Sequence, residues 1–437
     1  MVEWRSIQLG DLIDIKHGFA FKGEFFSQDK AQDVLVTPGN FAIGGGFQWG
    51  KQKFYDGPVP KDYVLHQGDL IVTMTDLSKD ADTLGYAAIV PHSDVRLLHN
   101  QRIGKVVARS REGHLPFLHW LMRSATYRHH VVSSASGSTV KHTSPTRILN
   151  FQFLLPPLEE QQAIASVLGA LDNKIDLNRR MNETLEAMAR ALFKDWFVDF
   201  GPTCAKMEGR AAYLAPDLWA LFPDRLDDEG KPEGWDNEPL LDHAALISGG
   251  TPKTDVGAYW NGHIPWASAK DVSQCRETFL IDTERTITER GLDESSTRIV
   301  PRGATVVVAR GATTGRYCMF GQPMAMNQTC YGIVTRSERP FWLNCAFGSI
   351  VRALVHNAHG SVFDTITTRT IEAARILNPG DLLLDAFEAH VASLFEGVLA
   401  NIAENATLAA TRDLLLPKLM SGEIRVRDAE KVLEPAL

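Results

Sequence analysis

Three segments come close to motifs that carry catalysis, and each lacks a residue that the chemistry needs. "NPGD" at Asn378 resembles the N/D-P-P-Y/F motif for base amino methylation, but it lacks the second proline and the aromatic residue. "RGATTGRY" at Arg310 has neither the spacing nor the lysine of a phosphate-binding loop. "GGG" at Gly44 lacks the spacing of a dinucleotide-binding fingerprint and predicts a flexible turn. We therefore expect no catalytic machinery in this chain.

Two other segments could in principle hold a metal ion. "PDRLDDEGK" at Pro223 has the acids and the lysine of a PD…ExK nuclease, but such a site divides its acids between strands, whereas these crowd a Pro/Gly-rich segment. The pair His129–His130 lies at the expected end of a helix, and no third ligand has suitable spacing. We expect this pair to be a partly buried helix terminus or a phosphate contact. A nuclease is the weakest of the functions considered.

Side chains suited to a polyanion gather in short loops rich in Gly, Ser and Thr. Lys and Arg suit phosphates, whereas Arg, Lys, Asn, Gln, Ser and Thr can bond base edges in a major groove. The candidate DNA-binding residues are Lys51, Gln52, Lys53, Thr75, Lys79, Arg102, Ser138, Thr139, Lys141, His142, Lys253, Thr254, Ser268, Lys270, Arg310, Thr313, Thr314 and Arg316. "RGATTGR" ranks first, because two arginines flank a loop just after the predicted strand "ATVVV".

These loops also have an ordinary interpretation. Gly/Ser/Thr-rich loops with a basic residue make common surface turns. The pairs Asn100–Gln101 and Asn327–Gln328 recur along the chain, and a repeated structural turn explains them as well as a base contact would.

The distribution of charge along the chain is also consistent with surfaces that bind a polyanion. The net charge is −8, which argues weakly against a nucleic-acid binder. Residues 96–147, however, contain nine Lys and Arg against the single acid Glu112, and residues 298–375 contain nine against three acids. Two basic segments on an acidic chain could form two surfaces that face polyanions, although chance clustering on solvated faces is the alternative.

Length and composition describe an ordinary globular protein of two domains or more. The chain has 437 residues, 44% of them hydrophobic and 22% charged. It contains no apolar run long enough for a membrane span, and its first residues lack the pattern of a signal peptide. The five scattered cysteines form no CxxC pair, so we expect neither a zinc site nor disulfides, and a reducing cytoplasm as the location.

The chain repeats itself, which divides it into two units. Trp4 and Trp235 open similar segments, "LHQGDLIVT" resembles "VPRGATVVV", "HNQRIGKVVAR" resembles "MNQTCYGIVTR", and "SGSTV" resembles "HGSVF". The sequence pattern of each unit predicts a mixed α/β domain of short Val/Ile strands, with a few helices such as residues 117–129. A long helix follows each domain. The Pro/Gly-rich and acidic segment between the units predicts a linker with one short helix.

The two long helical stretches share an uninterrupted heptad pattern. Its seam positions are Ile164, Leu168, Leu171, Ile175, Asn178, Asn182, Leu185, Ala189, Leu192 and Trp196. Adding 223 to each number gives Phe387, Val391, Leu394, Val398, Asn401, Asn405, Leu408, Arg412, Leu415 and Leu419. Asparagine returns in the same two slots, which predicts a coiled coil, the alternative being two ordinary core helices with stray polar residues.

Antiparallel pairing of these helices would satisfy the asparagines. A polar residue in a coiled-coil seam costs stability but fixes register, so we expect Asn178 against Asn405 and Asn182 against Asn401. The same register places Trp196 against Phe387. It also places Leu171 against Arg412, whose side chain would have to reach outward. Pro417 predicts that the second helix ends or kinks nearby.

Antiparallel helices would hold the two domains apart. Each domain precedes its helix in the sequence. Antiparallel pairing therefore predicts that the two domains lie at opposite ends of the helix pair, related by an approximate two-fold axis through the asparagines. Helices of about 35–40 residues span roughly 50–60 Å. On B-DNA that distance corresponds to about 15–17 base pairs. A rigid spacer between two modules that face a polyanion suits a two-part DNA site.

At this point the chain resembles a known family, the specificity (S) subunits of type I restriction–modification systems. "LPPLEEQQAIASVLGALDNKIDLNRRMNETLEAMARALFKDWFVDF" is similar to their central conserved region, and "TRDLLLPKLMSGEIRV" to the C-terminal one. "ISGGTPKTDVGAYWNGHIPWASAKDV" looks like the opening of a second target-recognition domain. One departure is that "RILNPGDLLLDAFEAHVASLFEGVL" replaces the PPLxEQ-like stretch that would precede the second helix.

The resemblance implies a non-catalytic subunit of a DNA adenine methyltransferase or restriction complex. Each recognition domain would read a few base pairs, and the helices would bind two methyltransferase (modification) subunits, often with two restriction/translocase subunits. S-adenosylmethionine, ATP and Mg would be bound by those partners. The main alternative is a stand-alone sequence-specific DNA-binding regulator. The predicted domains are 1–155 and 235–380 for target recognition, 156–200 for the central helix, 201–234 for the linker, and 381–437 for the C-terminal helix and tail.

Overall fold

The computed structural model describes residues 4–78, 80–357 and 365–433. The chain divides into two compact units. Unit 1 comprises residues 1–174 and 407–437, and unit 2 comprises residues 175–406. The division passes through both long helices, so each unit combines a predicted recognition domain with parts of both helices.

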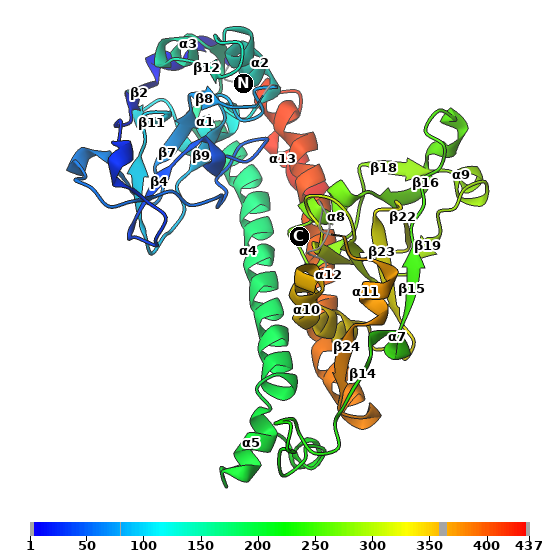
Figure 1. Cartoon of the computed structure of the whole chain (residues 1–437). Coiled ribbons are helices and arrows are strands. Elements are labelled where there is room, and N and C mark those ends of the chain that lie inside the picture. The colour runs from blue at the N-terminus through cyan, green and yellow to red at the C-terminus, as the bar shows by residue number, and fades with distance from the viewer. Residues whose placement is uncertain (1–3, 79, 358–364, 434–437) are drawn as a thin grey trace. The chain divides into compact units, whose positions relative to one another are not determined.

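Unit 1 contains two sheets with short helices beside them (Figure 1). Its four-stranded antiparallel sheet has the order β2 (Ile13–His17), β11 (Ile103–Ala108), β7 (Leu70–Thr73) and β9 (Ala87–Ile89). Its five-stranded sheet has the order β3 (Phe26–Ser27), β5 (Phe54–Tyr55), β4 (Asp33–Val36), β10 (Arg96–His99) and β6 (Val64–Leu65). Two small pairs complete it: β1 (Arg5–Gln8) with β13 (Gln152–Leu155), and β8 (Thr75–Asp76) with β12 (Lys141–His142). The helices of the domain are α1 (Leu115–Leu121), α2 (Ala125–Ser133) and α3 (Pro145–Leu149).

Unit 2 repeats this plan. Its five-stranded sheet has the order β15 (Ala244–Ser248), β23 (Cys330–Thr335), β20 (Thr305–Val308), β21 (Tyr317–Phe320) and β17 (Phe279–Leu280). Its four-stranded sheet has the order β18 (Arg285–Ile287), β16 (Trp260–Ala267), β22 (Met324–Met326) and β19 (Ile299–Val300), and β14 (Asp236–Pro239) pairs with β24 (Arg375–Asn378). The helices are α7 (Leu240–His243), α8 (Ala269–Gln274), α9 (Glu289–Asp293), α10 (Pro340–Asn357) and α11 (Thr368–Glu372).

The predicted duplication and mixed α/β class are confirmed. The order β2-β11-β7-β9 in unit 1 corresponds to β15-β23-β20-β21 in unit 2, and β1–β13 corresponds to β14–β24. Each unit also has a parallel pair in the equivalent place, β4–β10 and β16–β22. The two turn glycines of the repeat, Gly68 and Gly303, both have a left-handed backbone, with φ of +87° and +83°. Of the "SGSTV" and "HGSVF" repeat, the second copy lies outside the described residues.

Two expectations about short helices were wrong. The stretch predicted as one helix over 117–129 forms α1 and α2, because Ser124 interrupts it and its side chain accepts a hydrogen bond from Tyr127 N as a new N-cap. The linker contains two helices instead of one, α5 (Gly201–Met207) and α6 (Pro216–Trp219). Each has a proline in its first turn, where the missing N–H costs nothing.

The long helices begin at equivalent points despite the difference in sequence before them. α4 (Leu158–Phe197) starts three residues after β13 ends, and α12 (Asp381–Ser421) starts three residues after β24 ends. Before α12, Asn378 Oδ1 accepts a hydrogen bond from Gly380 N, and Gly380 has a left-handed backbone. The departure "RILNPGD" therefore changes the chemistry before the second helix but not the position where that helix starts.

Within unit 2, the antiparallel helix pair contains both expected asparagine pairs. Asn178 Nδ2 donates to Asn405 Oδ1 at 3.0 Å and to Glu404 Oε2 at 2.6 Å. Asn401 Nδ2 donates to Asn182 Oδ1 at 2.8 Å. Asn178 and Asn182 are only 1% and 2% exposed, so each amide would be costly without a partner. The register is therefore as predicted.

Aromatic side chains close the end of this helix pair. The rings of Trp196 and Phe387, a predicted pair, meet edge to face with centroids 5.6 Å apart. Phe193 and Phe197 also contact Phe387. All four belong to the main core of unit 2, so here the helices are part of the domain core.

Within unit 1, the slot predicted to hold Arg412 is ionic. Leu171 is fully buried as expected. Arg412 does not simply reach outward, because its guanidinium donates to Asp172 Oδ1 at 2.6 Å, and the guanidinium of Arg123 donates to Asp172 Oδ2 at 2.8 Å. Burial raises the pKa of Asp172, but the two guanidiniums lower it further, so that the net pKa is below the ordinary value.

Arg123 ties three parts of unit 1 together. Its side chain is 4% exposed, and its Nε donates to the carbonyl of Gly44 at 2.9 Å. Gly44 belongs to the "GGG" turn, whose three glycines all have left-handed backbones, so the turn assignment is confirmed. Burial also lowers the pKa of the adjacent His119 to about 3, which leaves its imidazole neutral beside the Arg123 charge.

Pro417 was expected to end or kink the second helix nearby, and α12 does end four residues later, at Ser421. Proline removes one backbone hydrogen bond. Leu415 and Leu419 on either side of it are 2% and 1% exposed. Their burial holds the last turn in place, and α13 (Val426–Leu433) follows.

Replacing Asn178, Asn182, Asn401 and Asn405 together with Leu should loosen the register of the helix pair while leaving it apolar. Cysteines at Leu185 and Val398 should cross-link efficiently in the parent protein with its own cysteines replaced by serine. In the leucine variant the same cross-link should fall by about half or more. A parallel series with the second cysteine at Val391, one heptad away, should then rise in yield. An unchanged cross-linking pattern would show that the asparagines do not set the register.

Candidate nucleic-acid interface

The predicted contact residues lie mostly on loops that follow the central strands of each unit. Most of their side chains are exposed, whereas Thr75 is buried and Lys141, Ser268 and Thr314 are half-buried. Lys79 lies outside the described residues.

In unit 1, two of the predicted loops are joined by the small β8–β12 ladder. His142 pairs with Thr75 and Lys141 with Asp76. The Thr75 hydroxyl lies 3.1 Å from His142 Nδ1, so these two side chains are committed to each other. The neighbouring Met74 N donates to Arg102 O at 2.9 Å, which adds Arg102 to the same cluster. The fold thus collects Thr75, Arg102, Lys141 and His142 in one place.

The loop after β8 is held by Asp76. Its carboxylate accepts hydrogen bonds from the backbone N–H groups of Ser78 and Thr83 and from the Thr83 hydroxyl. Burial raises the pKa of Asp76, but these hydrogen bonds outweigh it and lower the pKa below its ordinary value. The carboxylate therefore stays charged and holds the backbone on both sides of this loop.

Lys51, Gln52 and Lys53 lie beside the five-stranded sheet, on the approach to β5. Lys53 O accepts a hydrogen bond from Leu35 N, and its ammonium lies 3.8 Å from the centre of the Phe26 ring. This cation–π contact gives Lys53 a role within the fold, whereas Lys51 and Gln52 are exposed.

In unit 2, the predicted loops converge on the turn at residues 327–329. Asn327 N donates to Ala267 O at 2.9 Å, and Ala309 N donates to Thr329 O at 2.7 Å. The loop after β15 arrives as well, since Thr251 donates to the side chain of Gln328. The loops that carry Lys253, Ser268 and Arg310 therefore share one edge of the unit.

Some of these side chains already have partners, and others do not. Ser268 caps α8 through Asp271, Lys270 forms an ion pair with Glu284 at 2.6 Å, and the Thr314 hydroxyl donates to Gly311 O. Arg310 and Arg316 are exposed and make no ion pair with any described residue. A guanidinium without a carboxylate partner is the group best placed to meet an anion from outside.

The weaker metal candidates have structural explanations. His130 Nε2 lies 2.9 Å from Arg147 O, and its ring packs on Phe151, which fits a helix terminus. In "PDRLDDEGK", Lys231 pairs with Asp227 and Glu229 inside one turn of the linker. Within the described parts of the chain, no three His, Cys, Asp or Glu side chains come together as metal ligands. No helix there is long and apolar enough to cross a membrane.

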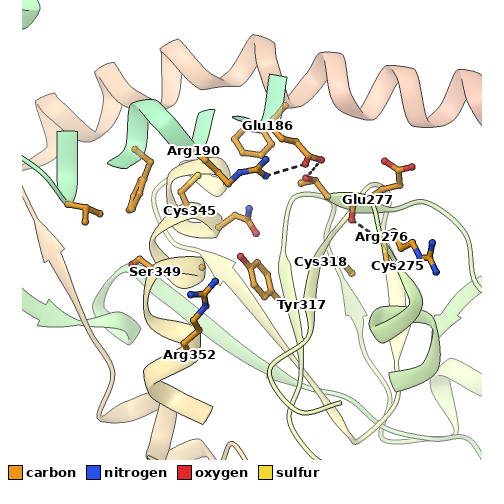
Figure 2. Close-up of a pocket in the computed structure, with 16 residues that line it drawn as sticks. Glu186, Arg190, Cys275, Arg276, Glu277, Tyr317, Cys318, Cys345, Ser349 and Arg352 are labelled. Carbon is orange, nitrogen blue, oxygen red and sulfur yellow. Dashed lines mark hydrogen bonds and ion pairs between the residues drawn. The ribbon is translucent and has the colours of Figure 1, made fainter. Parts of the chain in front are cut away.

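A cavity of about 530 Å³ in unit 2 lies between α4, α10 and the β21 strand. Figure 2 shows Arg190 directed at Glu186 on its rim, and these two form an ion pair at 3.2 Å. Burial raises the pKa of Cys345, which also lines the cavity, to about 12, so this thiol stays protonated and is a poor nucleophile. Cys345 is therefore not an activated nucleophile.

A second surface escaped the sequence analysis. Leu177, Met181 and Met188 lie at positions i, i+4 and i+11 of α4, and they are 52%, 45% and 53% exposed. They form an apolar stripe outside the seam. Their spacing was available in the sequence, but a heptad pattern directs attention to its own buried positions.

Comparison with known proteins agrees with this arrangement. A sequence model of the type I restriction modification DNA specificity domain matches residues 1–187 and 232–379. The HindI specificity subunit of Haemophilus influenzae is 27% identical over 354 residues, which cover 70% of this chain and 76% of that one. The MjaIX specificity subunit of Methanocaldococcus jannaschii is 26% identical over 350 residues, covering 79% and 76%.

The fold is shared with a solved structure. The S subunit of the type I restriction–modification system from M. genitalium superposes with a TM-score of 0.58 at 15% sequence identity, over 96% of each chain. Duplicated recognition folds, long helices with paired asparagines and matching family domains lead to one conclusion: the chain belongs to the family of specificity subunits of type I restriction–modification systems.

Proposed function

We propose that this protein reads a two-part target in double-stranded DNA and binds the subunits that methylate it. Each recognition domain would contact one half of the target, and the paired helices would set the distance between the halves. The protein itself would be non-catalytic. S-adenosylmethionine would be bound by two methyltransferase subunits, and ATP and Mg by restriction/translocase subunits where these are present.

The observation that carries this proposal is the duplication of a complete domain, down to individual hydrogen bonds. Met74 N donates to Arg102 O in unit 1, and Ala309 N donates to Thr329 O in unit 2. Thr143 N donates to Met74 O, and Ile366 N donates to Ala309 O. Two copies of one scaffold with different loop sequences suit two different half-sites.

The helices support the spacing function. α4 has 40 residues and α12 has 41. At 1.5 Å per residue each is about 60 Å long, or about 18 base pairs of B-DNA. A seam whose register is fixed by asparagines would keep such a spacer at one length.

The apolar stripe of α4 supports a protein partner. Leu177, Met181 and Met188 expose apolar surface on one face of the helix, which a soluble chain rarely does without use. A stand-alone DNA-binding regulator would need no such surface. The family membership makes a methyltransferase subunit the expected occupant.

Reconstitution tests the proposal directly. The chain combined with a type I methyltransferase subunit from the same organism should transfer methyl groups from S-adenosylmethionine to adenines of one bipartite DNA motif, and neither protein should do so alone. Sequencing of the methylated DNA would identify the motif. A complex that assembles but methylates no bipartite motif would contradict the proposal.

Arg310→Ala and Arg316→Ala should each weaken DNA binding by about 1–3 kcal/mol, because each removes an unpaired cation from the loop. The slope of log K against log salt should fall by about 0.9 for each phosphate that the variant no longer neutralises. Fluorescence anisotropy with a duplex that contains the motif measures both quantities.

Arg302→Ala is the matched control, because Arg302 precedes the strand β20 that Arg310 follows and is paired with Glu396. Its removal should leave DNA binding nearly unchanged. Equal effects of all three substitutions would argue against DNA binding by this loop.

Changing Leu177, Met181 and Met188 together to Ser should weaken binding of the methyltransferase subunit by about tenfold or more, since buried apolar anchors dominate protein interfaces. Calorimetric titration of the subunit into the variant would measure it. Glu183→Ser, on another face of the same helix, should bind normally. If both variants bind alike, the partner uses a different surface.

A further inference from the structure

One turn is built identically in the two units. In unit 1, Asn100 Oδ1 accepts a hydrogen bond from Arg102 N at 3.1 Å, and Asn100 O accepts one from Ile103 N at 3.0 Å. In unit 2, Asn327 Oδ1 accepts from Thr329 N at 3.2 Å, and Asn327 O accepts from Cys330 N at 3.2 Å. The asparagines therefore have a structural role in both copies.

A glycine fixes each turn against the first strand of its sheet. A Cβ on Gly18 would lie 2.0 Å from Asn100 O, and a Cβ on Gly249 would lie 1.9 Å from Asn327 O. No side chain fits at such distances, so glycine is required for close approach at both positions. Gly18 N donates to Ile103 O, and Gly249 N donates to Cys330 O, which completes the same connection.

The residue after each asparagine is glutamine, and both side chains are exposed at the tip of the turn. Gln101 makes no side-chain hydrogen bond with any described residue. The carbonyl oxygen of Gln328 accepts a hydrogen bond from the Thr251 hydroxyl. That bond occupies the acceptor end of the amide and leaves its NH₂ group as the available donor.

The turns lie beside the loops proposed to contact DNA. Arg102 O and Thr329 O, two residues past the asparagines, accept the hydrogen bonds that position Met74 and Ala309. The segments that follow Met74 and Ala309 in the sequence differ between the units: they are residues 75–84 in unit 1 and residues 310–314 in unit 2. Thr75 is buried in the first, whereas Arg310 is exposed in the second.

Identical glutamines within different surroundings indicate an interaction with something that both half-sites share. The bases of the two half-sites need not be alike, but the sugar–phosphate backbone is the same in both. An amide N–H donor on a rigid turn suits a phosphate oxygen, and such hydrogen bonds fix register without carrying sequence information.

We infer that Gln101 and Gln328 each donate a hydrogen bond to a DNA phosphate and anchor the two recognition domains on their half-sites in the same way. The inference rests on the proposed reading of DNA, and it assigns a positioning role to residues outside the candidate DNA-binding set. The asparagine, the glycine and, in unit 2, Thr251 hold the donor in place.

The test compares Gln101→Ala, Gln328→Ala and the double variant in the complete complex with its methyltransferase subunits. Each single variant should weaken binding about fivefold to both the motif duplex and a random duplex, and the double variant about 25-fold. The methylated motif should not change. Because glutamine is neutral, the salt slope should also stay unchanged, unlike that of Arg310→Ala.

Conservative variants separate hydrogen bonding from shape. Gln101→Lys keeps a donor and should restore or exceed parental affinity, whereas Gln101→Glu places a carboxylate against phosphate and should bind more weakly than the alanine variant. Gln152→Ala, at an exposed glutamine of β13, should have no effect.

Two results would overturn the inference. Relaxed specificity at one base of one half-site would make the glutamine a base reader. Parental affinity in a normally folded double variant would make the turn purely structural. Both outcomes leave the proposed function intact, because that function fails only if the parental complex methylates no bipartite motif.

Discussion

The amides buried in the helix seam constrain much of what this protein can be. A primary amide in an apolar seam is costly unless its donor and acceptor are both used, and only one antiparallel register brings Asn178 to Asn405 and Asn182 to Asn401. Apolar residues alone would tolerate neighbouring registers, because one Leu or Val packs against another with little preference. The polar pairs therefore exchange some stability for a defined alignment of two long helices.

The ionic group in unit 1 follows the same principle, that a buried polar group needs its partner, but a buried charge costs more free energy to leave unpaired than a buried amide does. Asp172 lies between two guanidiniums, and Arg123 is nearly inaccessible to water. Loss of one partner from such a buried set typically costs about 3–5 kcal/mol, because a desolvated charge remains behind. Since Arg123 also holds the "GGG" turn, its side chain connects the helix seam with the recognition domain of this unit.

The duplication combines a repeated scaffold with loops that differ between the two units. Hydrogen bonds at strand ends, such as those around Asn100 and Asn327, recur in the two units, and glycines permit the same close approach. The loops between these fixed points differ in length and charge. A rigid scaffold that carries variable loops allows one recognition surface to change without loss of the fold.

Periodicity and local chemistry were enough to predict the scaffold. The mixed α/β class, the duplication, the two long helices and the partner of each asparagine can all be worked out from residue order, because a hydrophobic repeat or a polar residue in a seam is visible there directly. The turn glycines, and the position of the "RGATTGR" loop directly after a buried strand, could also be predicted from residue order. The division between α1 and α2 could not, because a single serine cap competes there with an otherwise helical pattern.

Which loops meet, and which of their side chains stay available, depends instead on how distant strands and helices pack. The side chains of Thr75 and His142 form a hydrogen bond with each other although 67 residues separate them, and the ammonium of Lys53 lies over the Phe26 ring. Arg412, expected beside Leu171, is bound to an aspartate 240 residues away in sequence. A heptad pattern aligns two helices, but no pattern in the sequence shows which ionic or loop side chains then meet, so these contacts become visible only in the folded chain.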